Sequence, residues 1–182
     1  MNKKYIGICG SIRSSSYSRI IMSYIQKSEY FYGRMNTIDI SNIPHYSQDV
    51  ESDNIPEEVK KYRNDISSSL GVIIVTPEYN HGMPGVLKNA LDWFSRPLSK
   101  SCMHEKPAFF VTHSPGALGG VRAQYQIRET LTALSCRLSP TPEIAITYVM
   151  NKIDNNELND KQIEKFLLEN LKKYKEFSEG GC

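Results

Sequence analysis

Residues 10–18 form the first segment whose side chains could do chemistry, and they read Gly-Ser-Ile-Arg-Ser-Ser-Ser-Tyr-Ser. The serine hydroxyls can donate hydrogen bonds, and the guanidinium of Arg13 can donate two of them to one phosphate group. A helix that begins directly after such a loop adds backbone N–H donors and partial positive charge. We therefore interpret this segment as an anion site, and a solvent-exposed turn that only caps a helix is the alternative.

The spacing of this segment excludes two other phosphate-binding arrangements. The phosphatase pattern C-x5-R needs an arginine six residues after its cysteine, and Ser15 stands six residues after Cys9. The triphosphate loop G-x-x-x-x-G-K-[ST] needs a lysine and a second glycine that the segment lacks. A monophosphate held by hydroxyls and Arg13 remains the interpretation.

Residues 76–85, Thr-Pro-Glu-Tyr-Asn-His-Gly-Met-Pro-Gly, form a second candidate segment. Two prolines and two glycines impose an irregular backbone with exposed peptide groups, which suits the polar edge of a flat heterocycle such as isoalloxazine or nicotinamide. Tyr79 and Asn80 could supply an aromatic surface and polar contacts. A turn that only precedes a helix is the alternative.

The third segment, residues 113–120, reads His-Ser-Pro-Gly-Ala-Leu-Gly-Gly. Its small residues would let a ligand approach the backbone closely, although the dinucleotide pattern G-x-G-x-x-G is absent from the chain. His81 and His113 could steer a proton or a substrate anion, and ordinary hydrogen-bonded loop histidines are the alternative.

Apolar runs of strand length alternate with segments of helical period along the chain. The pattern predicts strands over residues 4–9, 35–40, 71–75, 107–112 and 143–147, and helices over residues 18–28, 56–71, 84–94, 121–134 and 160–177. Such alternation is what a parallel sheet with helical crossovers requires. We predict one flavodoxin-like α/β domain over residues 1–182, with a doubly wound five-stranded parallel sheet of order 2-1-3-4-5 in three α/β/α layers.

The three chemistry-bearing segments follow the first, third and fourth predicted strands. In a doubly wound fold, ligands bind outside the carboxyl ends of the strands. Each segment alone is a weak signal, but their coincidence at this edge predicts one shared ligand site. Elsewhere, Glu78 and Arg96 carry opposite charges and could pair within or across subunits. The last helix is expected to bury Phe166 with its other apolar residues.

Composition excludes several classes of protein. With 22 lysine and arginine residues against 20 aspartate and glutamate residues, the chain carries a net charge of +2, too small to favour nucleic acid or an anionic membrane. The longest apolar runs are far shorter than the ~20 residues of a membrane span. The four cysteines lie far apart, so we assign no metal site, and we expect a cytoplasmic protein.

Three stretches of sequence resemble the NAD(P)H-dependent FMN reductase family, which includes azoreductases, quinone reductases and chromate-reducing flavoproteins. They read Gly-Ser-Ile-Arg-Ser-Ser-Ser, Pro-Glu-Tyr-Asn-His-Gly-Met-Pro-Gly-Val-Leu-Lys-Asn-Ala-Leu-Asp-Trp and Ser-Pro-Gly-Ala-Leu-Gly-Gly. The resemblance spans residues 3–146. It implies a flavodoxin-like homodimer, sometimes a homotetramer, with FMN near the subunit interface.

The resemblance also implies site residues by their position in the motifs. The FMN phosphate would be held by Ser11, Arg13, Ser16 and Ser18. The flavin would be lined by Pro77, Glu78, Tyr79 and Asn80, and the pocket would be completed by Ser114, Gly116 and Gly119. Many family members have asparagine where Ser18 stands and serine where Gly82 stands.

The implied activity is hydride transfer from NADPH or NADH through FMN to an acceptor such as a quinone, an azo compound, a metal oxyanion or free flavin. The flavin carries this chemistry, so we assign no catalytic nucleophile and expect ping-pong turnover. A non-catalytic flavodoxin-type electron carrier is the alternative, although its steering usually relies on a large charge of one sign. A nucleotide-binding adaptor without redox chemistry is a third possibility.

Overall fold

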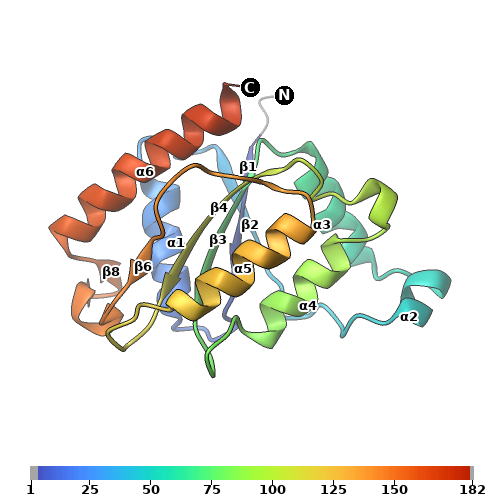
Figure 1. Ribbon diagram of the computed structural model, residues 1–182, viewed down its shortest axis with the longest axis horizontal. Coiled ribbons are helices and arrows are strands. Elements are labelled where there is room, and N and C mark those ends of the chain that lie inside the picture. Colours follow the sequence, from blue (N-terminus) through green and yellow to red (C-terminus); the bar gives the residue numbers. More distant parts are fainter. Residues whose placement is uncertain (1–3, 181–182) are drawn as a thin grey trace.

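The computed structural model describes residues 4–180 and shows alternating strands and helices (Figure 1). The strands are β1 (Tyr5–Cys9), β2 (Met35–Ile38), β3 (Val72–Pro77), β4 (Pro107–His113), β5 (Arg137–Leu138), β6 (Ala145–Ile146), β7 (Ile153–Asp154) and β8 (Glu157–Leu158). The α-helices are α1 (Tyr17–Lys27), α2 (Gln48–Asp53), α3 (Glu57–Ser68), α4 (Gly85–Phe94), α5 (Val121–Ala133) and α6 (Lys161–Glu179). Two short 3-10 helices are η1 (Leu98–Lys100) and η2 (Val149–Lys152).

The main sheet is parallel and has the order β2-β1-β3-β4-β5, which confirms the predicted flavodoxin-like fold. One hydrophobic cluster joins the sheet to α3, α4 and α5, and a second joins its other face to α1 and α6. Figure 1 shows the same layers, with α1 and α6 on one side of the sheet and α3, α4 and α5 on the other.

The centre of the sheet follows from the run Val72–Val75, in which every residue is apolar and fully buried. Successive side chains of a strand point to opposite faces. Val72 and Ile74 accordingly pack in the cluster with α3, α4 and α5, while Ile73 and Val75 pack in the cluster with α1 and α6. A strand covered on both faces has no polar alternation, which is why this run predicted the central strand.

The fifth strand differs from the prediction of one strand over residues 143–147. It consists of two short pieces, β5 and β6, which both pair with β4. The chain between them contains Pro140 and Pro142, which have no N–H to donate to a ladder. The last bond before them runs from Ser139 N–H to the Ala108 carbonyl (2.9 Å), so the chain leaves the sheet there and returns at β6.

The structure also contains elements that the sequence pattern did not predict. Helix α2 lies in the polar stretch after β2, where the Ser47 hydroxyl accepts the Asp49 N–H (3.3 Å) as a cap. The β7–β8 hairpin turns at Asn155 and Asn156, which both have positive φ. Phe166 is exposed, so the prediction that α6 buries it is wrong.

The fully buried Tyr174 of α6 contacts the amino-terminal ends of the central strands. Its hydroxyl donates to the carbonyls of Val72 (3.0 Å) and Pro107 (3.2 Å), at the first residues of β3 and β4. Its ring stacks on Phe109 with centroids 5.3 Å apart. These contacts fix α6 at the amino edge of the strands, so the carboxyl edge is left to the loops that carry the site.

Candidate functional site

The three segments predicted from the sequence meet at the carboxyl edge of β1, β3 and β4. His113, the last residue of β4, connects them. Its carbonyl accepts the N–H of Glu78 from the second segment (3.4 Å), and its Nε2 lies 2.7 Å from the Oγ of Ser18, the last residue of the first segment. The parallel sheet therefore brings the segments into contact, as its topology requires.

The first segment forms the start of α1. The Ser16 hydroxyl accepts the Ser18 N–H (3.1 Å) and caps the helix. Arg13 is exposed, donates from Nη2 to the Ser15 carbonyl (3.0 Å), and places its guanidinium 5.5 Å from the centre of the Tyr17 ring. A helix start and an exposed guanidinium thus stand within one loop, which is the donor set an anion needs.

The three serines of the predicted phosphate set are buried, and only Arg13 is exposed. Ser11 lines a pocket of about 230 Å³ on the β2 side of α1, together with Arg19 and Asp39. Ser18 is fully buried, and its hydroxyl contacts His113. The structure therefore leaves Arg13 at the surface beside the helix start and turns the Ser18 hydroxyl inward.

Electrostatics keep His113 uncharged. Burial, and to a smaller extent the positive charge of Arg13, lowers the pKa of this imidazole from 6.5 to about 4. Its Nδ1 is buried without a hydrogen-bond partner among the described residues. A neutral imidazole can either accept from the Ser18 hydroxyl or donate to it through Nε2, according to its tautomer.

The second segment projects from the sheet edge as a tight two-residue turn. Tyr79 N–H donates to the Gly82 carbonyl (2.9 Å), and Gly82 N–H donates back to the Tyr79 carbonyl (3.0 Å). Asn80 and His81 between them have φ of 48° and 67°, the left-handed values that such a turn requires. Tyr79, Asn80 and His81 are exposed, whereas Pro77 is buried at the end of β3.

The Glu78 side chain points to α5. Its Oε2 accepts the N–H groups of Arg122 (2.9 Å) and Ala123 (3.2 Å), and its Oε1 lies 3.4 Å from the Arg122 guanidinium. Helix α5 begins after a glycine without a side-chain cap, so Glu78 supplies the missing cap from another loop. Within the chain, Glu78 does not pair with Arg96, whose guanidinium lies 5.4 Å from the centre of the Tyr46 ring instead.

Gln126 of α5 is a site residue that the sequence analysis missed. Its Oε1 accepts the Met83 N–H (2.8 Å), and a Cβ on Gly82 would lie 2.6 Å from the same oxygen. Glycine is therefore the residue that leaves room for the Gln126 amide. A polar residue one turn after Arg122 is too common in helices to be singled out without the structure.

The third segment is packed by its glycines. Gly119 has φ of +60°, and a Cβ there would lie 2.7 Å from backbone atoms of Ala145. Its carbonyl accepts the Thr112 hydroxyl (3.0 Å). Gly119 thus serves close packing against β6, while Gly116 is exposed and Ser114 donates to its carbonyl (3.2 Å).

Each of the three segments also presents one large apolar side chain to solvent. Ile12, Tyr79 and Leu118 are 52%, 53% and 50% exposed. A flat ring needs an apolar surface beside its polar contacts. The edge therefore combines anion donors at the α1 start with apolar groups from all three loops.

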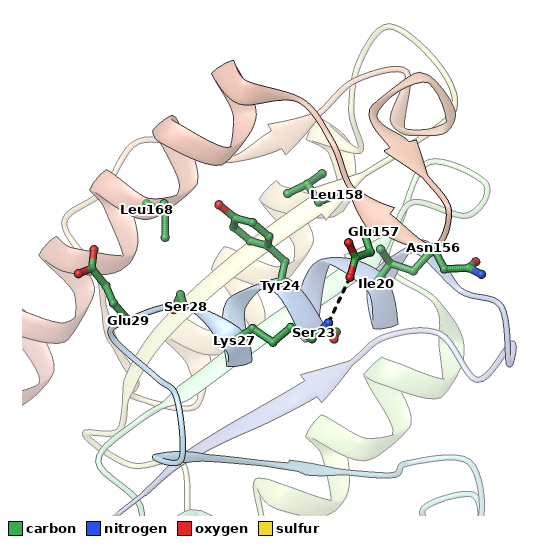
Figure 2. A pocket seen from close by; sticks show the side chains of 10 residues that line it. All are labelled: Ile20, Ser23, Tyr24, Lys27, Ser28, Glu29, Asn156, Glu157, Leu158 and Leu168. Carbon is green, nitrogen blue, oxygen red and sulfur yellow. Dashed lines mark hydrogen bonds and ion pairs between the residues drawn. The ribbon is translucent and has the colours of Figure 1, made fainter.

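A separate pocket of about 420 Å³ lies between α1, the β7–β8 hairpin and α6 (Figure 2). Figure 2 shows Tyr24 and Leu158 along its walls and the ion pair between Lys27 and Glu157, whose Nζ and Oε1 are 3.4 Å apart. None of the site residues predicted from the sequence lines it.

The fold defines a class: a doubly wound α/β protein whose loops after β1, β3 and β4 meet at the carboxyl edge of its sheet. The family model described as NADPH-dependent FMN reductase matches residues 4–150. The chain belongs to this family.

Relatives and solved structures agree with this membership. The chain is 36% identical over 155 residues to a quinone reductase of Pseudomonas putida, covering 85% of this chain and 83% of that protein. It is 35% identical to a 2-hydroxy-1,4-benzoquinone reductase of a Burkholderia species, covering 96% and 95%. A flavoenzyme NAD(P)H:(acceptor) oxidoreductase of Paracoccus denitrificans superposes with a TM-score of 0.87 at 30% identity over 98% of both chains.

The chain is accordingly an NAD(P)H-dependent flavin oxidoreductase, and its cofactors are FMN and NADPH or NADH. The resemblance inferred from the three motifs is confirmed. Among the helices of residues 4–180, none is both long enough and apolar enough to cross a membrane.

The depressed pKa of His113 predicts an acid-sensitive fold. The imidazole has an ordinary pKa of 6.5 when the chain is unfolded and about 4 when it is folded. Between pH 6.5 and pH 4 the unfolded chain binds a proton at His113 that the folded chain does not. The contribution of His113 to the free energy of unfolding is therefore fully present above pH 6.5 and is lost as the pH falls towards 4. We expect this histidine to account for a loss of about 3 kcal/mol at pH 4.

Urea unfolding between pH 7 and pH 4 measures the effect. His113→Gln removes the titrating group and keeps a polar side chain, so its free energy of unfolding should fall less steeply with acid. Equal slopes for the two proteins would show that His113 does not titrate in this range.

Proposed function

We propose that the chain catalyses reduction of a small quinone by NAD(P)H, with FMN bound at the carboxyl edge of β1, β3 and β4. The observation that carries the proposal is the joining of Arg13 and the capped start of α1 with exposed apolar side chains from all three loops. The names of the relatives support a quinone as the acceptor. Azo compounds, metal oxyanions and free flavin are further candidates.

The donor set fits the phosphate of FMN. Arg13 would give it a charge-assisted contact, the Ser11 and Ser16 region would add polar groups, and the start of α1 would add partial positive charge. Ser18 would contribute through the geometry of this turn, because its hydroxyl already contacts His113. Such a phosphate contact is local, so it needs no large net charge on the protein.

The remaining loop residues suit the flavin ring and its edge. Tyr79 and the backbone of Pro77 and Asn80 would line the ring from the second loop, and Glu78 would hold α5 in place behind it. Ser114, Gly116 and the packed turn at Gly119 would bound the pocket on the third side. Bound FMN supplies the two-electron chemistry between nicotinamide and acceptor.

Arg13→Ala tests the phosphate site. We expect this variant to bind FMN about 10-fold to 100-fold more weakly, because a charge-assisted contact contributes about 1.5–3 kcal/mol. Riboflavin, which lacks the phosphate, should bind the variant and the parent alike. Fluorescence quenching of either flavin measures both affinities.

Arg19→Ala is the matched control for this experiment. Arg19 carries the same charge six residues later in the chain, and its Nη2 lies 3.9 Å from Oδ1 of Asp39. It does not belong to the predicted phosphate set. If both variants lost FMN affinity equally, the effect would be general electrostatics and the site would be misplaced.

Steady-state kinetics with NADPH or NADH and a benzoquinone test the activity. Because one open edge serves donor and acceptor in turn, we expect parallel double-reciprocal plots. Rapid quinone-dependent oxidation of pyridine nucleotide by the yellow protein supports the enzyme. Colour without such oxidation would instead indicate an electron carrier, and no FMN uptake would indicate an adaptor.

We also propose that two copies of the chain pair through the apolar surface beside the site, as a homodimer or as part of a homotetramer. Tyr125, Tyr148 and Met150 are 62%, 50% and 55% exposed, and Tyr148 N–H donates to the Gly116 carbonyl of the third loop (3.1 Å). Exposed aromatic and methionine side chains are enriched at subunit interfaces. Sedimentation velocity should show a dimer that Tyr125→Asp weakens, and a monomeric parent would contradict the proposal.

A further inference from the structure

His113 lies where the three loops meet, and its side chain is buried away from solvent. Its side chain is 3% exposed, and that of its partner Ser18 is fully buried. Through its carbonyl it holds Glu78, and through Nε2 it holds Ser18, so one residue links β4 to both neighbouring loops. The side chain therefore fixes the start of α1 relative to the end of β4.

The imidazole also contacts the first turn of α1 through Tyr17. The two rings lie edge to face with centroids 6.2 Å apart, and the Arg13 guanidinium lies 5.5 Å from the centre of the same Tyr17 ring. Tyr17 therefore contacts both His113 and the residue that would bind the phosphate.

Stability alone does not explain a histidine at this position. A buried polar atom without a partner costs about 1–3 kcal/mol, and Nδ1 of His113 is such an atom. An apolar pair, such as leucine here and alanine at position 18, would avoid this cost without leaving a buried hydroxyl unpaired. Buried groups left unsatisfied in this way call for a functional explanation.

We propose that His113 is a positioning residue of the mononucleotide site. Its hydrogen bond to Ser18 sets the first turn of α1, so that this turn and Arg13, whose guanidinium lies on the Tyr17 ring of the same turn, face one phosphate group. The consequence is selectivity for FMN over riboflavin. The inference rests on the proposed function, because it concerns the same site.

Three substitutions separate the two ring nitrogens. In His113→Gln the amide nitrogen replaces Nε2 and can keep the bond to Ser18, in His113→Asn it replaces Nδ1 and loses that bond, and His113→Leu removes both. We expect His113→Gln to retain FMN affinity within about 3-fold. His113→Asn and His113→Leu should each bind FMN about 10-fold more weakly, as for the loss of one hydrogen bond. Riboflavin affinity should change less than about 2-fold in all three, on the same scale.

Ser18→Ala removes the same hydrogen bond from the other side. If the pair acts as a unit, Ser18→Ala combined with His113→Leu should weaken FMN binding no more than either change alone. This cycle keeps the test sharp if one of the histidine variants folds poorly. Thermal unfolding of every variant identifies such a case.

Thr112→Val is the matched control. Thr112 is the buried residue of β4 that precedes His113. Its hydroxyl donates to the Gly119 carbonyl in the loop after β4, so this bond does not involve α1. We expect this variant to lose stability but to keep the parent's ratio of FMN to riboflavin affinity.

The outcomes distinguish the inference from the function on which it rests. If the parent does not bind FMN, the proposed function fails and the inference fails with it. If the parent binds FMN but all His113 variants match it, or lose FMN and riboflavin in equal measure, the inference alone is overturned. The inference is supported if His113→Asn and His113→Leu lose affinity for FMN but not for riboflavin, while His113→Gln retains its affinity for FMN.

Discussion

Parallel pairing of β1, β3 and β4 is the constraint on which the rest of the molecule depends. It sends the three following loops to one edge and leaves the other edge to contacts such as Tyr174 with the strand starts. Because parallel strands must be covered on both faces, the helices that return between them are also prescribed. The site is therefore a consequence of strand direction, and its chemistry depends on the loop residues.

The loops at this edge are irregular, yet their conformations are well determined. Glu78 caps α5 from a neighbouring loop, Gln126 holds the Met83 N–H, and His113 holds Ser18. Each contact joins two different elements of the carboxyl edge. The Ser18 hydroxyl would otherwise lie unpaired in the interior, whereas the contacts of Glu78 and Gln126 restrain the loops nearer the surface.

The division between buried and exposed groups matches a flavoenzyme that meets two small substrates. Buried polar contacts fix the backbone, while Arg13, Ile12, Tyr79 and Leu118 remain at the surface. A site assembled from fixed loops around exposed apolar groups is preorganised for a flat ligand and stays open to a donor and an acceptor in turn. This supports reduction of small acceptors more than exchange with a large protein partner.

The sequence by itself predicted the strand order, five of the helices and the three loops that meet at one edge, because periodicity and strand-end rules depend on local pattern. It could not determine the split of the fifth strand or the partners of Glu78, Ser18 and Gly82. Those depend on residues far along the chain, such as Arg122, His113 and Gln126, which meet only after folding. Burial and pairing of polar atoms are properties of the packed structure, so only the tertiary arrangement decided which of the predicted residues are exposed and which hold the loops.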